Sequence, residues 1–137
     1  MLAYLVFLLY QANSSATIEN RINLAIGSNC GSSATYQVTS FIVSPWPISP
    51  GEVGEIIMTG TFHDTVHVDE IFILTTYNSE STSVNTIEVQ QTFNAGTTKE
   101  FQFRNQFSNK QGSYLSKVEL VTSTPISCWQ FAYTLDD

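Results

Sequence analysis

Apolar and polar side chains alternate along most of the chain, which is the pattern of half-buried β-strands. The clearest example is residues 53–62, where Ile56, Met58 and Phe62 fall on one face. Short polar segments such as 94–96, which contains a glycine, separate these runs. The pattern predicts about seven strands, at residues 35–43, 53–62, 66–77, 84–93, 98–107, 114–122 and 126–135.

Strands at this spacing, with no internal repeat or linker, predict one all-β domain, an immunoglobulin-like β-sandwich of antiparallel strands. Each sheet would then bury one face and expose the other. The alternation shifts near Asp69 and Glu70, as a β-bulge would cause. Three prolines within residues 45–50 end the preceding strand, because proline cannot donate to a strand ladder. Residues 18–28 fit a short helix or a ragged strand.

The N-terminal residues 2–10 form an apolar run of the length of a signal-peptide core. A helix that spans a bilayer needs about 20 residues. Small residues follow at 14–16, although no Lys or Arg precedes the run. We predict a signal peptide at 1–16 and a secreted or lumenal domain at 17–137. The alternatives are an uncleaved membrane-proximal segment and a first strand of the domain.

Charge and cysteine content narrow the function. The net charge is −7 with only five Lys and Arg residues, whereas phosphate binding needs clustered basic side chains. The composition therefore argues against nucleic acid as a partner and against docking on anionic membranes by charge. Two cysteines cannot form a four-cysteine zinc site. They leave either one disulfide or two free thiols.

Catalytic signatures are missing from the sequence. It holds no Gly-x-Ser-x-Gly elbow, His-Glu-x-x-His motif or phosphate-binding glycine loop, and its acidic residues are scattered. We expect no enzyme and no cofactor. His63 and His67 flank Asp64, but positions i and i+4 of a strand lie about 13 Å apart, too far to share a tetrahedral ion. We therefore expect no metal site.

Several local motifs follow one another in an order that resembles the ML (lipid-recognition) domain family. They are Asn-Cys-Gly-Ser at 29–32, a proline-rich segment at 45–51, Ile-x-Met-x-Gly-x-Phe at 56–62, Gly-Ser-Tyr at 112–114 and Pro-Ile-Ser-Cys-Trp-Gln-Phe at 125–131. This family includes the lysosomal sterol carrier, the ganglioside activator and the phospholipid transfer proteins. The resemblance covers about residues 28–135. No single motif is specific; the spacing of all of them together is.

The resemblance implies a disulfide. Cys30 and Cys128 match the first and last cysteines of the family, which are bonded there. A bridge that closes nearly the whole domain would stabilise it by about 4–5 kcal/mol on the chain-entropy model. Family members usually carry two or three disulfides, and this chain can form one. Pro45, Pro47 and Pro50 would partly compensate by stiffening the chain.

The resemblance also implies a lipid cavity between splayed sheets, which would hold a sterol, a fatty acid or a neutral lipid. The scarcity of basic residues disfavours an anionic head group. Any single apolar residue can equally belong to an ordinary core. The cavity candidates are Phe41, Ile56, Met58, Phe62, Val68, Ile71, Ile73, Val89, Phe101, Phe103, Tyr114, Val118, Trp129, Phe131 and Tyr133.

Two other functions fit the sequence. One is a fully packed structural or interaction domain whose surface meets another protein or a membrane. The other is a carbohydrate-binding sandwich that uses an exposed Trp46 or Tyr77 as a stacking platform. An apolar internal cavity would distinguish lipid binding from both.

Overall fold

The described part of the chain, residues 26–33 and 35–136 of a computed structural model, forms eight antiparallel strands. The predicted signal peptide, 1–16, lies outside the described residues. No helix among those described is long and apolar enough to cross a membrane. The strands are β2 (Ser28–Asn29), β3 (Tyr36–Ser44), β4 (Val53–Phe62), β5 (Val66–Tyr77), β6 (Glu80–Phe93), β7 (Thr98–Gln106), β8 (Gly112–Val121) and β9 (Pro125–Leu135).

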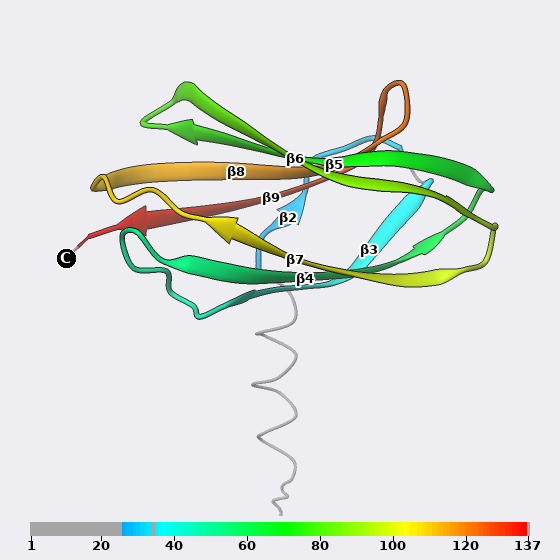
Figure 1. The fold of residues 1–137 in the computed structure, drawn as a ribbon, viewed down its shortest axis with the longest axis horizontal. Helices are drawn as coiled ribbons and strands as arrows, with labels where there is room; N and C mark the ends of the chain where they lie inside the picture. The colour runs from blue at the N-terminus through cyan, green and yellow to red at the C-terminus, as the bar shows by residue number, and fades with distance from the viewer. Residues whose placement is uncertain (1–25, 34, 137) are drawn as a thin grey trace, which may run out of the picture.

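The strands form two sheets that face one another (Figure 1). One sheet has five strands in the order β2-β9-β8-β5-β6, and the other has three in the order β3-β4-β7. The predicted all-β sandwich is therefore confirmed. The seven long strands correspond to the seven expected from the alternation, and β2 is a two-residue addition at one edge.

The hairpin between β5 and β6 is tighter than the sequence indicated. We expected a polar turn at 78–83, whereas β6 already begins at Glu80. Asn78 and Ser79 have φ of 48° and 71°, as in the two-residue turns that suit the twist of a hairpin. Polar residues after the turn therefore pair as strand.

The predicted bulge near Asp69 and Glu70 is confirmed. The register between β5 and β6 shifts between Val68 and Glu70. The extra residue lies in β6, where Gln90 has φ of 48°. At the bulge, both Val68 and Ile71 face the interior. In a regular strand, residues at i and i+3 would face opposite sides of the sheet.

Apolar side chains from both sheets fill the centre of the sandwich. Ile56, Met58 and Phe62 in β4 are fully buried, as the alternation predicts. Gly60 shares their inward face through the same alternation, and a Cβ there would lie 2.5 Å from Cζ of Tyr36. The close approach of the tyrosine ring therefore requires glycine at this position.

The two ends of the sandwich differ in their connections. Three segments cross between the sheets at one end, which we call the crossover end: 30–35, 63–65 and 94–97. Hydrogen bonds join them; for example, His63 N donates to Thr35 O at 2.8 Å. The opposite end, the open end, holds the hairpin turns 45–52 and 78–79, and of the described connections only 107–111 crosses there (Figure 1).

The predicted disulfide is confirmed. Cys30 and Cys128 are bonded, with their Cα atoms 5.0 Å apart and a sequence separation of 98. Cys30 directly follows β2, and its backbone N donates to Cys128 O in β9 at 2.9 Å. Because β2 and β9 belong to the same sheet, the bridge does not fix the distance between the two sheets.

Candidate functional site: a cleft at the open end

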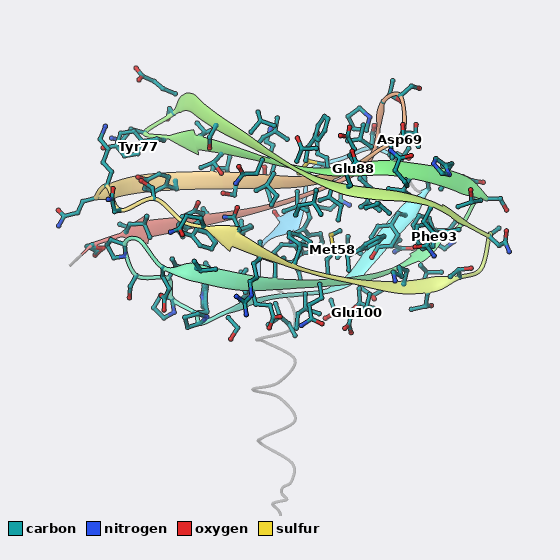
Figure 2. The ribbon with its side chains drawn as sticks, in the orientation of Figure 1. Met58, Asp69, Tyr77, Glu88, Phe93 and Glu100 are labelled. Carbon is teal, nitrogen blue, oxygen red and sulfur yellow. A yellow bond between two sulfur atoms is a disulfide. The ribbon has the colours of Figure 1, made fainter. Side chains whose placement is uncertain are left out.

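A cleft of about 460 Å³ opens between the five-stranded sheet and β7 at the open end of the sandwich. Figure 2 shows Tyr77 at this end and Phe93 at the other. The loop at 107–111 forms one side of the cleft. The lining residues are Thr75, Tyr77, Ser83, Asn85, Asn105, Gln106, Phe107, Ser108, Lys110, Tyr114 and Tyr133.

Four aromatic rings from different elements form the apolar part of the wall. Tyr114 and Tyr133 stack with their ring centroids 5.4 Å apart and their planes at 5°. Phe107 meets Tyr133 edge-on at 5.3 Å, and Tyr77 lies 5.0 Å from Tyr114. Offset and edge-on ring pairs of this kind are favourable beyond the area they bury. The wall is therefore a connected aromatic surface.

Two of the tyrosines also fix the loop that borders the cleft. Tyr77 donates its hydroxyl proton to Gln111 O at 3.0 Å, and Tyr114 donates to Lys110 O at 2.6 Å. The Lys110 ammonium lies 4.4 Å from the centroid of the Tyr77 ring, a cation–π arrangement. These contacts place the only charged side chain of the lining at its exposed rim.

A chain of hydroxyl groups lies behind the aromatic wall. Ser116 Oγ is 2.8 Å from the Tyr133 hydroxyl and 3.0 Å from Thr75 Oγ1. Burial raises the pKa of Tyr133, against the opposing effect of its hydrogen bonds to Ser116 and Thr75. Tyr133 therefore stays uncharged at neutral pH and presents a neutral ring to the cleft.

A pair of amides bridges the edges of the two sheets. Asn85 in β6 donates from Nδ2 to Oδ1 of Asn105 in β7 at 3.1 Å. Asn105 is only 5% exposed, and both residues line the cleft. The strands that carry them are edge strands of different sheets. This side-chain contact therefore links the sheets where no backbone ladder does.

A smaller groove of about 240 Å³ lies between the edge strands β6 and β7. Its apolar lining comes from Ile71, Ile87, Val89, Phe101 and Phe103. Charged and amide side chains, including Lys99 and Glu100, make up the rest. The mixed lining makes it a weaker candidate for an apolar ligand than the cleft.

The predicted cavity residues divide among three places. Only Tyr114 and Tyr133 line the cleft, while Ile71, Val89, Phe101 and Phe103 line the smaller groove. The others contact neither hollow and pack in the core, where Met58 is 0% exposed. These are Phe41, Ile56, Met58, Phe62, Val68, Ile73, Val118, Trp129 and Phe131.

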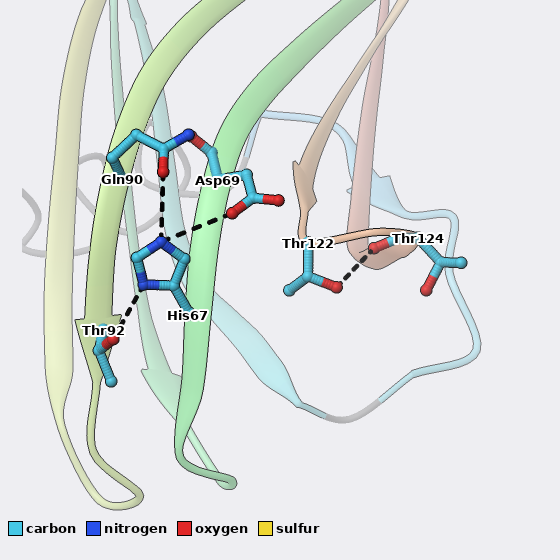
Figure 3. Close-up of polar contacts among 6 residues, drawn as sticks. All are labelled: His67, Asp69, Gln90, Thr92, Thr122 and Thr124. Atoms are coloured by element: carbon cyan, nitrogen blue, oxygen red, sulfur yellow. Dashed lines mark hydrogen bonds and ion pairs between the residues drawn. The ribbon is translucent and has the colours of Figure 1, made fainter.

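The two histidines do not meet. His63 Nε2 lies 3.0 Å from Gln37 Oε1. Figure 3 shows His67 at the bulge, with Nδ1 2.9 Å from Thr92 Oγ1 and Nε2 3.3 Å from Gln90 Oε1. No group of three potential metal ligands lies among the described residues.

The polar residues of the cleft were not predicted from the sequence, because an alternating pattern marks apolar faces and not the polar residues among them. Asn105 carried the strongest signal, because it points to the same buried face of β7 as Phe101 and Phe103. A polar residue at a core position is the informative departure from a hydrophobic pattern. Asn85 stands in the same relation to Ile87 in β6.

Comparison with protein-family models and with curated protein sequences finds no match. Among solved structures, a Niemann-Pick type C2 protein from the Japanese carpenter ant has a TM-score of 0.64 and 13% identity, covering 82% of this chain and 100% of that one. The C-terminal domain of wzt has a TM-score of 0.66 and 10% identity, covering 82% of this chain and 83% of that one. At such identities the likeness shows a shared β-sandwich fold.

Proposed function

We propose that this protein binds a lipid in the open-end cleft and carries it without chemical change. The observation that supports this most directly is the cleft, a space of about 460 Å³ between two sheets with aromatic rings on its wall. Small-ligand pockets usually measure about 300–1,000 Å³. Transfer of the ligand from water would contribute about 0.8 kcal/mol for each buried CH₂ group.

Fold and motifs support the same class. The likeness in fold to a Niemann-Pick type C2 protein agrees with the resemblance of the sequence motifs to the ML family, of which we propose the chain is a distant member. A sterol, a fatty acid or a neutral lipid is the proposed ligand. The disulfide supports a secreted or lumenal location, since such bonds persist in oxidising compartments.

The chemistry of the lining supports binding rather than catalysis. Its side chains are aromatic rings, amides, hydroxyls and Lys110 at the rim. General acid–base catalysis usually depends on a carboxylate or imidazole placed at the reacting group, and the lining side chains include neither. We therefore propose that the ligand leaves the cleft as it entered.

A pair of tryptophan substitutions on one strand tests the location of binding. Ser83 faces the cleft from β6, whereas its neighbour Val84 is 56% exposed on the other face. Ser83→Trp should fill the cleft and weaken binding of a fluorescent sterol or fatty acid at least tenfold. Val84→Trp should leave the affinity within about twofold of wild type. Fluorescence titration measures both, and circular dichroism checks the fold.

The proposal is wrong if folded wild-type protein binds no sterol, fatty acid or neutral lipid at micromolar concentration. The second candidate, a packed interaction domain, would then take its place. Trp46 and Val53, which are 40% and 48% exposed, favour that alternative. Trp46 lies in the hairpin turn 45–52 and Val53 directly follows it. In this turn Gly51 N donates to Ser108 O at the rim of the cleft.

A further inference from the structure

Asn105 is a buried amide with a hydrogen-bonding group to spare. The residue is buried, with 5% of its surface exposed, and it lines the cleft. Its Oδ1 accepts a hydrogen bond from Asn85. Its Nδ2 makes no hydrogen bond within the described residues. Turning the Asn105 amide alone would set its Nδ2 against Nδ2 of Asn85, two donors with no acceptor between them, so the hydrogen bond to Asn85 favours the orientation in which the free end is the donor.

Buried polar groups in folded proteins are nearly always hydrogen-bonded. The spare N–H groups of Asn105 therefore call for an acceptor that the described residues do not supply. Asn105 lies on the inward face of β7 that also carries Phe103. The rings of Phe107, Tyr114 and Tyr133 line the cleft with it. A ligand in the cleft is placed to supply the acceptor.

The charge distribution selects the kind of acceptor. Lys110 is the only cation of the lining, and its ammonium is held against the Tyr77 ring at the exposed rim. A carboxylate or phosphate buried against the neutral amide of Asn105 would have no counter-charge beside it, and burial of an unpaired charge is strongly unfavourable. An uncharged oxygen carries no such penalty.

We propose that Asn105 selects ligands with an uncharged oxygen acceptor, a hydroxyl or a carbonyl, placed within an otherwise apolar body. This inference rests on the proposed function and narrows it, because it disfavours lipids whose buried end is ionised. Phe107, Tyr114 and Tyr133 of the aromatic wall contact the apolar part of the ligand. Asn85 holds Asn105 from the other side, so that its donor points to the ligand.

Three naphthalene probes of nearly equal shape test the selection. They are 2-acetonaphthone, which has a carbonyl, 2-isopropenylnaphthalene, in which a CH₂ replaces that oxygen, and 2-naphthoate, which is anionic. We expect the ketone-to-hydrocarbon affinity ratio to fall about threefold to tenfold in Asn105→Leu, the value of one neutral hydrogen bond. Asn94→Leu, in the turn at the crossover end, is the matched control and should leave the ratio unchanged.

Nuclear magnetic resonance on wild-type protein gives a reading that does not depend on the folding of Asn105→Leu. The side-chain amide protons of Asn105 should shift when the ketone is added and not when the hydrocarbon is added. Binding of both neutral probes with an unchanged ratio in Asn105→Leu would overturn the inference and leave the proposed function standing. Tighter binding of 2-naphthoate than of the ketone would also overturn it. If no probe and no lipid binds, the proposed function fails and this inference fails with it.

Discussion

Tyr36 shows how one buried hydroxyl couples the fold to pH. Its ring packs against Phe62 with centroids 4.7 Å apart, and its hydroxyl donates to Lys99 O in β7 at 3.0 Å. Burial raises the pKa of Tyr36 far above the ordinary tyrosine value of about 10. The folded state therefore holds this proton more tightly than the unfolded state.

The sign of the pH effect follows from that difference. The stabilisation that comes from the protonated Tyr36 hydroxyl is fully present below the unfolded-state pKa. It is lost as the pH rises from that value through the higher pKa of the folded state. We expect the free energy of unfolding to fall steeply above about pH 10. Tyr36→Phe should lower it by about 1 kcal/mol at pH 7, through loss of a hydrogen bond, and should make the alkaline fall shallower. Urea titrations at pH 7, 9 and 11 measure both. Parallel curves for the two proteins would contradict this account.

Single residues were predicted unevenly from the sequence. Burial of Met58 and Phe62 follows from alternation alone, because successive side chains of a strand point to opposite faces of the sheet. Their assignment to core or cavity does not follow, since it depends on how far the sheets separate. Asn105 could be seen in the sequence as a polar residue at a position that alternation assigns to the buried face. Its partner Asn85, however, belongs to another sheet. No local pattern predicts that contact.

At the level of the strands, Gly112 at the start of β8 leaves the space in which the Tyr77 ring of the cleft wall lies. Its φ is 151°, and a Cβ there would lie 2.4 Å from Cε1 of Tyr77. Gly112→Ala should displace the Tyr77 ring and weaken its hydrogen bond to the loop at 107–111. We expect about threefold to tenfold weaker binding of a fluorescent sterol, the value of about one hydrogen bond.

Gly96→Ala is the matched control for that substitution. Gly96 also has a positive φ, 90°, but a Cβ there would meet nothing within 4 Å, and it lies at the crossover end. It should lower the melting temperature without changing sterol affinity. An equal loss of affinity in both variants would mean that general destabilisation, and not the position of Tyr77, controls binding.

The positions of the strands were predicted from the sequence better than single-residue contacts or the site of the cleft. The bounds of β4 and β5 match the alternation, and the bulge near Asp69 was visible as a change of phase. The start of β6 was missed because its first residues are polar and follow a turn whose positive φ values at Asn78 and Ser79 were not anticipated. Edge strands need few apolar residues, so hydrophobic pattern marks their ends poorly.

The disulfide acts at the scale of the whole molecule. Its 98-residue separation predicts a stabilisation of about 4–5 kcal/mol through restriction of the unfolded chain. Cys30→Ser combined with Cys128→Ala should lower the free energy of unfolding by about that amount, with alanine chosen because Cys128 is buried. Urea unfolding of the oxidised wild type and the double variant measures the difference. A loss under about 1 kcal/mol would contradict the chain-entropy account.

Sandwich architecture followed from the spacing of the strands, whereas the site of the cleft did not. The sequence does not say which strands lie at the edges, and so it could not place β6 and β7 beside one another on opposite sheets. The resemblance to the ML family indicated a cavity along the inner faces. In the structure, side chains fill the centre of the sandwich, and the cleft lies between the five-stranded sheet and β7 at the open end.

The unequal distribution of crossings has a mechanical consequence. Three of the four connections between the sheets among the described residues lie at one end, so that end is the natural pivot for any rotation of one sheet against the other. Displacement grows with distance from a pivot, and a small rotation there would widen the far end while hardly disturbing the rings packed beside the pivot. The length of the turn at 94–97 would then set the width of the cleft, although the turn is not part of the cleft lining. A longer or shorter turn would therefore change the size of the opening with every side chain of the cleft retained.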